Sequence, residues 1–363
     1  MWPDNRLTNL FNIQNPIIQA PMAGASGSAM AIATSKAGGL GSLPCAMLSI
    51  EKMHSEMSII RQKTKAPMNV NFFVYDRPLI NLEKDRLWLN HLSKYYSEFN
   101  LQMDNQHSKS RREPFNEAAF GFVDSFRPEV VSFHFGLPEK IYLDRLKKLG
   151  CKIMSSATTV EEACWLEKNG CDVIIAQGFE AGGHRAMFLT NDINTQVGTM
   201  ALLPQVVDAV SVPVIAAGGI ADGRGIVAAF ALGASGVQIG TPYLFTEEAL
   251  ISEIHLSQLK TSKDNDTAIT NLFSGRPARG IINRLMQEVG PMSEFPSEFP
   301  TAGKALGPLK NEAEAQGNSD FSSLWSCQSA GLCKETHAEA LTNSLATGAL
   351  KKLKMKSTKK ILI

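Results

Sequence analysis

The sequence lacks several signatures that would define common protein classes. Its six cysteines include no C-x-x-C pair, which argues against a zinc site, a thioredoxin-type site and a disulfide framework. The 36 basic and 35 acidic residues nearly cancel, so a strongly basic nucleic-acid binder and an acidic tail protein are excluded as whole-chain interpretations. No G-x-G-x-x-G or Walker sequence occurs, so a Rossmann or P-loop nucleotide domain is not supported.

Signals for secretion and membrane insertion are missing as well. The N-terminus has no basic region followed by an apolar run, so we expect no signal peptide and a cytoplasmic location. Residues 226–245 carry no charge, but glycines and Pro242 interrupt them, and we expect a buried helix followed by a buried strand. Residues 351–363 carry six lysines, which predicts a solvated basic tail, with contact to an anionic partner as the alternative.

What the chain does contain is 44% hydrophobic residues, enough for a sizeable core. Many of them fall in short apolar runs bounded by glycine or proline, the pattern of strands buried on both faces of a parallel sheet. The expected strands are residues 16–20, 39–43, 68–74, 129–133, 152–155, 172–177, 213–217 and 236–240.

Helical patterns alternate with these strands. Residues 49–64, 138–149, 159–169 and 222–232 are expected helices, and Thr159 with Glu162 forms a capping-box sequence. Eight strand–helix units predict an α/β fold, a (βα)₈ TIM barrel, with an open doubly wound sheet as the alternative.

Two long segments interrupt the alternation. They predict a second, mainly helical domain that covers one end of the barrel and binds substrate. The expected division assigns residues 1–74, 128–250 and 320–350 to the barrel, residues 75–127 and 251–319 to the helical lid, and residues 351–363 to the basic tail.

In barrels of this kind, functional residues collect at the carboxyl ends of the strands. Gly218 and Gly219 follow the seventh expected strand, and Gly240 and Thr241 follow the eighth. Glycine lets the backbone approach a ligand closely, and exposed N–H groups bind phosphate. We therefore predict a phosphate site at these two turns rather than turns with a purely structural role.

His184 is the strongest catalytic candidate, because it follows the sixth strand in a Glu-Ala-Gly-Gly-His segment and can act as a general base or as a cation. His134 ends the fourth strand and is either a second active-site histidine or a hydrogen-bonded core residue. No histidine and carboxylate pair has metal-ligand spacing, so no metal is expected. The remaining histidines are expected at the surface: His54, His91, His107, His255 and His337.

Taken together, the strand ends resemble the nitronate monooxygenase family, formerly called 2-nitropropane dioxygenases. The order and spacing of the matching segments carry the resemblance, which extends to about Arg284, with a weaker match at residues 324–328. The segments are PIIQAPMAGASG (16–27), AGGLGSLPC (37–45), NVNFF (69–73), VVSFHFGLP (130–138), AQGFEAGGHR (176–185), PVIAAGGIADGRG (213–225), GVQIGTPYLFTEEA (236–249) and FSGRPARGIINR (273–284).

The resemblance implies a TIM barrel with a helical second domain, bound FMN, and His184 as the catalytic base. It also implies that the flavin contacts Met22, Asn71, Gln177, Gly182, Gly219, Gln238, Gly240 and Thr241. Two residues depart from the common pattern, since Ala186 and Cys327 stand where relatives often have glycine.

The implied reaction oxidises an alkyl nitronate, and as a second class nitroalkanes, with O₂ to a carbonyl compound and nitrite. Flavin supplies the electron transfer, while the protein supplies position and charge. The expected partners are a small-molecule substrate and O₂, with no nucleic acid and no membrane; a homodimer is left open. The nearest alternative is an FMN-dependent NAD(P)H reductase of the enoyl-acyl-carrier-protein or quinone type. A flavin-free phosphosugar lyase or isomerase and a non-enzymatic binding protein are the more remote alternatives.

Overall fold

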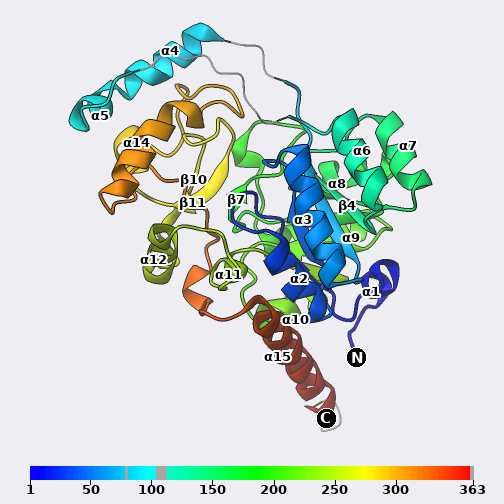
Figure 1. The fold of residues 1–363 in the computed structure, drawn as a ribbon. Coiled ribbons are helices and arrows are strands. Elements are labelled where there is room, and N and C mark those ends of the chain that lie inside the picture. Colours follow the sequence, from blue (N-terminus) through cyan, green and yellow to red (C-terminus); the bar gives the residue numbers. More distant parts are fainter. Residues whose placement is uncertain (78–80, 104–112, 360–363) are drawn as a thin grey trace.

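A closed barrel of eight parallel strands forms the centre of the molecule (Figure 1). The structure is a computed structural model that describes residues 1–77, 81–103 and 113–359. The sheet closes where the Leu40 amide donates to the Ile17 carbonyl (2.9 Å) and the Gln19 amide donates to the Leu40 carbonyl (3.0 Å). The barrel strands are β1 (Ile17–Gln19), β2 (Gly41–Pro44), β3 (Met68–Phe73), β4 (Val130–His134), β5 (Lys152–Ala157), β6 (Val173–Gln177), β8 (Val214–Ala217) and β9 (Gly236–Ile239).

All eight predicted strands are present, and the (βα)₈ barrel is confirmed; the open-sheet alternative is wrong. Nearly every strand residue is buried, as expected for strands covered by helices outside and by side chains inside. The short helix α1 (Arg6–Phe11) closes the end of the barrel where the strands begin, because Leu7 and Phe11 pack among inward residues such as Val130 and Val173.

Helices surround the barrel and connect successive strands. They are α2 (Ser28–Lys36), α3 (Ile50–Lys63), α6 (Glu117–Phe126), α7 (Lys140–Lys148), α8 (Val160–Lys168), α9 (Thr199–Ala209), α10 (Gly223–Ala231) and α15 (Ala338–Lys359). The α15 helix packs against α10 and α2 and so completes the ring. Gly223 permits this contact, since a Cβ atom there would lie 2.6 Å from the Ala349 amide nitrogen.

The uncharged stretch at residues 226–245 folds as predicted into a buried helix followed by a buried strand. It holds most of α10, all of β9 and then the short helix α11 (Thr241–Leu244). Within the described ranges, no helix combines the length and the hydropathy needed to cross a membrane.

A second unit lies over the carboxyl ends of the strands and is called the cap here. It contains α4 (Leu82–His91), α5 (Ser93–Glu98), α12 (Glu253–Thr261), α13 (Arg284–Val289) and α14 (Gly303–Ala315). The cap has its own hydrophobic core, in which Trp88 and Tyr95 of the first inserted segment pack with Leu285 and Leu309 of the second. Phe321 also belongs to this core, although the sequence-based division assigns it to the barrel.

The packing bears on where the cap begins. Helices α4 and α5 contribute to the cap core, whereas α6, which also falls within residues 75–127, packs against α3 and α7 of the barrel ring. The proposed division of the chain into domains remains a prediction, and the packing of α6 favours a boundary ahead of this helix.

The cap also contains a small antiparallel sheet that the sequence patterns do not predict. Strands β10 (Thr267–Thr270) and β11 (Ala278–Ile281) form a hairpin, and the two-residue strand β7 (Gly183–His184) pairs with β11. Because β7 belongs to the connection after β6, this sheet ties the barrel to the cap at His184, where Ala278 is its register partner.

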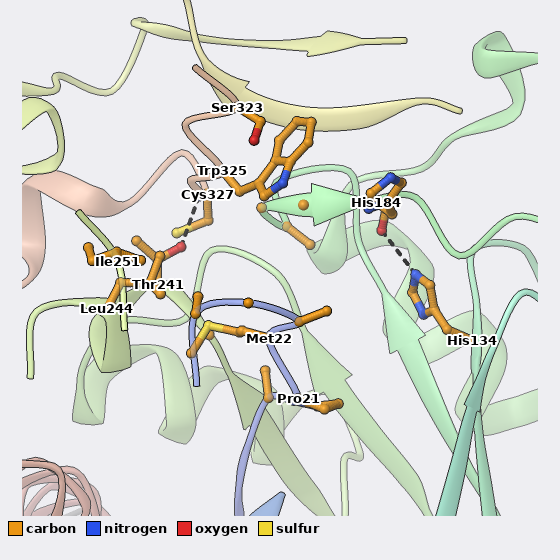
Figure 2. A pocket seen from close by; sticks show the side chains of 18 of the residues that line it. Pro21, Met22, His134, His184, Thr241, Leu244, Ile251, Ser323, Trp325 and Cys327 are labelled. Carbon is orange, nitrogen blue, oxygen red and sulfur yellow. Dashed lines mark hydrogen bonds between the residues drawn. The ribbon is translucent and has the colours of Figure 1, made fainter. Parts of the chain in front are cut away.

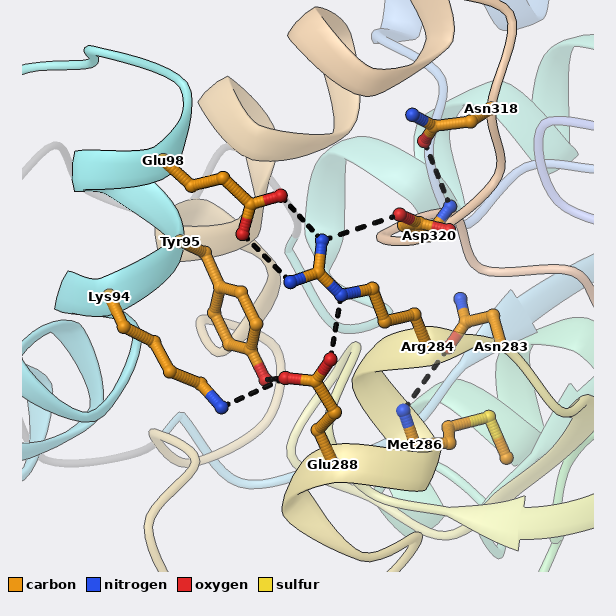
Figure 3. Close-up of polar contacts among 9 residues, drawn as sticks. All are labelled: Lys94, Tyr95, Glu98, Asn283, Arg284, Met286, Glu288, Asn318 and Asp320. Carbon is orange, nitrogen blue, oxygen red and sulfur yellow. Dashed lines mark hydrogen bonds and ion pairs between the residues drawn. The ribbon is translucent and has the colours of Figure 1, made fainter.

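Charged residues fasten α5 to α13 at the surface of the cap (Figure 3). Arg284 donates two hydrogen bonds of 2.7 Å to Glu98 and one of 2.7 Å to Glu288. Lys94 and Tyr95 also donate to Glu288, at 2.8 and 2.9 Å. Hydrogen bonds from Lys94, Arg284 and Tyr95 lower the pKa of the Glu288 carboxyl to about 2.

We predict that Arg284→Gln loosens α5. Hydrogen exchange of the amides in residues 93–98 should accelerate about two- to tenfold at pH 7, the range for an exposed network of ion pairs. A folded-state pKa below the unfolded value near 4.3 means that the carboxylate stabilises the fold above that pH and loses this effect toward pH 2. The difference between variant and parent should therefore shrink over that interval.

The matched control is Lys140→Gln, which removes an exposed pair with Asp144 on α7, away from the cap. It should leave exchange in α5 unchanged. Equal exchange of α5 in the Arg284 variant and the parent at pH 7 would contradict the role given to this network.

Candidate functional site

A cavity of about 540 Å³ lies between the carboxyl ends of the barrel strands and the cap. Figure 2 shows Pro21 and Met22 on one side of it and Trp325 on the opposite side. All eleven residues that the sequence predicts for the site line this cavity. They are Met22, Asn71, His134, Gln177, Gly182, His184, Gly218, Gly219, Gln238, Gly240 and Thr241.

The two glycine turns present backbone donors to the cavity. Gly218 and Gly219 have φ angles of +122° and +68°, a region that glycine adopts without strain. Within the part of the chain that the structure describes, no hydrogen-bond acceptor pairs with the amides of Gly219, Gly240 or Thr241. These amides can therefore bind an anionic group such as a phosphate.

Side-chain amides at the strand ends differ in what they can offer a ligand. The Gln238 Oε1 atom is buried and finds no hydrogen-bond partner among the residues that the structure describes, so it is an acceptor for a bound molecule. Gln177 is already engaged, because its Nε2 donates to the His184 carbonyl (3.0 Å) and its Oε1 accepts from the Ala186 amide (2.8 Å). Gln177 thus shapes the loop that carries His184.

Gly182 permits two walls of the cavity to meet. A Cβ atom at this position would lie 2.6 Å from the Cys327 amide nitrogen and from the Ser326 carbonyl carbon. The same Cys327 amide donates to the Thr241 hydroxyl at 3.0 Å. Cys327, which stands where relatives often have glycine, is buried beside the cavity and therefore affects the shape of the cavity.

The His184 ring lies in an enclosed and largely aromatic environment. Its Nε2 lies 2.8 Å from the Ser274 hydroxyl oxygen. The rings of Trp325 and Phe299 have centroids 5.5 and 5.7 Å from the imidazole, and Phe73 lies at 6.3 Å. Such rings exclude water, which strengthens the electrostatic interactions of a charge at this position.

His134 has a different character. Its Nε2 donates to the His184 carbonyl oxygen at 3.2 Å (Figure 2), so its proton is held by the backbone of the neighbouring loop. Burial lowers its pKa to about 3, and the positive charges of Arg276 and Arg185 act in the same direction, against the opposing effect of the hydrogen bond. His134 is therefore neutral near pH 7 and cannot hold an anion by its own charge.

A buried arginine supports this loop from behind. The Arg185 side chain is fully buried and donates to the carbonyls of Gly178 (2.7 Å) and Gln177 (2.8 Å) and to Gln196 Oε1 (2.8 Å). Burial lowers its pKa to about 9. Gln196 Nε2 in turn donates to the Thr158 hydroxyl at 2.9 Å. Several hydrogen bonds therefore hold the end of β6 in place.

The prediction that His255 lies at the surface is wrong. It is buried on α12, lines the cavity, and its Nε2 donates to the Trp325 carbonyl at 3.1 Å. His91 and His337 are exposed as predicted, whereas His54 is half-buried beside Phe122 and Phe126. His107 lies outside the described residues.

The sequence analysis did not identify several cap residues that line the cavity, although some of them fall within the family-like segments at residues 273–284 and 324–328. These are Phe273 and Ser274 of the FSGRP segment, Trp325 beside Cys327, and Lys310 and Glu314 of α14.

Comparison with known proteins places the chain in a family. The family model described as nitronate monooxygenase matches residues 4–348. The chain belongs to the nitronate monooxygenase family. It is 38% identical over 346 residues to the nitronate monooxygenase of Pseudomonas aeruginosa, covering 94% of this chain and 98% of that one. It is 37% identical over 346 residues to the probable nitronate monooxygenase of Staphylococcus saprophyticus, covering 95% and 97% of the two chains.

Solved structures agree with this membership. The nitroalkane oxidase from Streptomyces ansochromogenes superposes with a TM-score of 0.85 and 32% identity, covering 96% of this chain and 99% of that one. FabK from Thermotoga maritima superposes with a TM-score of 0.74 and 26% identity, covering 99% and 100%. The nitronate monooxygenase family assignment thus rests on whole-chain similarity in sequence and in fold.

We predict that Gly182→Ala separates the two walls that meet at this glycine. Overpacking of this kind costs about 1–3 kcal/mol of stability. The Cys327 segment should shift, and its buried thiol should become reactive toward a maleimide, as mapped by mass spectrometry.

The neighbouring Gly183→Ala is the matched control. Its φ of +72° imposes backbone strain, but no atom lies within 4 Å of the new Cβ. Cys327 should remain protected there. A Cys327 thiol that stays unreactive in Gly182→Ala would refute the steric role assigned to Gly182.

Proposed function

We propose that this chain oxidises alkyl nitronates with O₂ in a flavin-dependent reaction that yields a carbonyl compound and nitrite, and that nitroalkanes are a second substrate class. One cavity holds the His184 imidazole together with unpaired turn amides and the unpartnered Gln238 oxygen, and this arrangement carries the proposal most directly. Family membership and the relatives' names support it. A cytoplasmic location and a homodimer remain predictions.

The residues of the cavity fit a flavin mononucleotide. The amides of Gly219, Gly240 and Thr241 would hold its single phosphate, and Gln238 Oε1 would accept a hydrogen bond from a polar edge of the ring. Electron transfer from the substrate and reaction with O₂ are the chemistry that a bound flavin supplies. We propose FMN rather than FAD because one pair of glycine turns is present and no dinucleotide fingerprint occurs.

The chain's own residues supply position, charge and proton transfer. For a nitroalkane, the neutral His184 imidazole takes the proton from the carbon beside the nitro group, and the electron pair stays behind as the nitronate. For a nitronate, which has already lost that proton, a protonated His184 would hold the anion. His134, Gln177 and Arg185 keep the His184 loop in place through its backbone.

An FMN-dependent NAD(P)H reductase remains the second candidate function, because the FabK structure from Thermotoga maritima shares the fold at 26% identity. Anaerobic mixing of the flavin-loaded protein with NADH separates the two. Rapid bleaching of the flavin favours the reductase, and nitrite release from a nitronate in air favours the oxidation proposed here.

We predict that acid releases FMN from the purified protein, with identity checked by mass measurement. Gly219→Val should yield largely flavin-free protein, since a bulky residue at φ +68° disturbs the turn and its amide. Gly150→Val is the control, because Gly150 has a φ of +85° with open space around it, at the end of α7. Recovery of FAD, or full flavin content in Gly219→Val, would count against the proposed phosphate site.

We predict that His184→Asn separates the two substrates. As a general base, His184 contributes about 10²–10⁴-fold, so kcat/KM should fall by roughly that factor on a nitroalkane and much less on a preformed nitronate. The control is His337→Asn, an exposed histidine outside the cavity.

Comparable losses on both substrates would assign His184 to holding the anion instead of removing the proton. Unchanged rates on both substrates, in a variant with full flavin content, would remove His184 from the mechanism.

A further inference from the structure

The turn between β10 and β11 provides a hydrogen bond between a cap side chain and the His184 ring. Ser274 in this turn belongs to the FSGRP segment, whose role the proposed reaction leaves unassigned. Its hydroxyl oxygen lies 2.8 Å from His184 Nε2, and its exposed fraction is 4%. Water therefore has little access to this contact.

The turn holds the Ser274 oxygen in place. The Arg276 amide donates to Ser274 Oγ at 3.3 Å, and the hydroxyl donates to the Arg276 carbonyl at 3.2 Å. Gly275 has a φ of +88°, and a Cβ atom there would lie 2.4 Å from the Ser297 carbonyl oxygen. The turn thus has no room to shift in that direction. Arg276 anchors its far side by donating to the Met187 carbonyl at 2.9 Å.

These contacts allow an arrangement of protons in which Ser274 accepts a hydrogen bond from the imidazole. A serine hydroxyl has one proton, and the Arg276 carbonyl can only accept it. With that proton directed to the carbonyl, Ser274 Oγ is an acceptor for His184 Nε2–H. A neutral imidazole that carries its proton on Nε2 has its basic lone pair on Nδ1.

We propose that Ser274 is a positioning residue that fixes the orientation and the tautomer of His184. The proposal rests on the function given above. When His184 takes the α-proton of a nitroalkane, the C–H bond breaks, its electron pair remains on the substrate as nitronate, and the proton arrives at Nδ1. The ring becomes a cation, and its Nε2–H bond to Ser274 becomes charge-assisted and stronger. Ser274 therefore stabilises the protonated ring more than the neutral one.

Three variants test this role in the flavin-loaded protein. Ser274→Ala removes the acceptor, and Ser274→Thr keeps a hydroxyl at the same position. Thr270→Val is the matched control, because it removes another buried hydroxyl of the same hairpin, one that accepts from the Leu272 amide at 3.2 Å and does not contact His184.

Ring ¹⁵N NMR of histidine-labelled protein reports the tautomer directly, and His184→Asn identifies the His184 signals by their loss. In the parent protein the proton should reside on Nε2, and Ser274→Ala should give a mixture of tautomers. On a nitroalkane, kcat/KM should fall about 10- to 100-fold, the effect of one hydrogen bond to a charged group, mainly through kcat. On a preformed nitronate the loss should be smaller. Ser274→Thr should restore most of the rate, and Thr270→Val should match the parent.

An unchanged tautomer in Ser274→Ala overturns the proposal, as does a parent protein with its proton on Nδ1. Equal losses in Ser274→Ala and Thr270→Val also overturn it, since they would reflect general damage to the hairpin. Absence of nitronate turnover in the parent protein refutes the proposed function, whereas the NMR comparison still decides the role of Ser274.

Discussion

The pairing of a two-residue strand, β7, with the cap hairpin is the constraint on which the site depends. His184 lies in the connection after β6, a segment that the barrel alone would leave as a loop at its open end. Backbone pairing with Ala278 holds it from the cap side, while hydrogen bonds from Gln177 and His134 to its carbonyl hold it from the barrel side. The imidazole is thus set at the boundary between two units, each of which has a core of its own.

Two buried arginines lie close to this boundary between the barrel and the cap. Arg185 and Arg279 are buried, and the hydrogen bonds of their guanidinium groups go to carbonyl, amide and hydroxyl oxygens rather than to carboxylates. These neutral acceptors satisfy the N–H donors of the two guanidinium groups, but they do not compensate the positive charge of the arginines by direct contact. Positive charge therefore lies beside residues 177–185, close to the carboxylates of Glu180 and Glu162. Together with burial, which is the larger cause, the charge of Arg185 keeps His134 neutral.

Much of the barrel could be predicted from the sequence, and less of the cap. Barrel strands are continuous apolar runs, because they are buried on both faces, and their ends locate the cavity residues without knowledge of distant contacts. The strands Thr267–Thr270 and Ala278–Ile281 are short and contain polar residues and a glycine, so their pairing depends on partners far away in the chain. His255 shows the same limit: α12 has a polar sequence, and only the cap's packing against Trp325 buries its histidine.

The cap core also has a consequence for how the chain acquires its structure during synthesis. Its first contributors, Trp88 and Tyr95, emerge long before Leu309 and Phe321, and the helix that completes the barrel ring, α15, follows them all. Domains that fold as they emerge tend to form from the N-terminus, yet here both units must wait for late segments. The apolar faces of α4 and α5 remain uncovered in the meantime, so the nascent chain exposes them to chaperones or to neighbouring chains until the second half of the cap arrives.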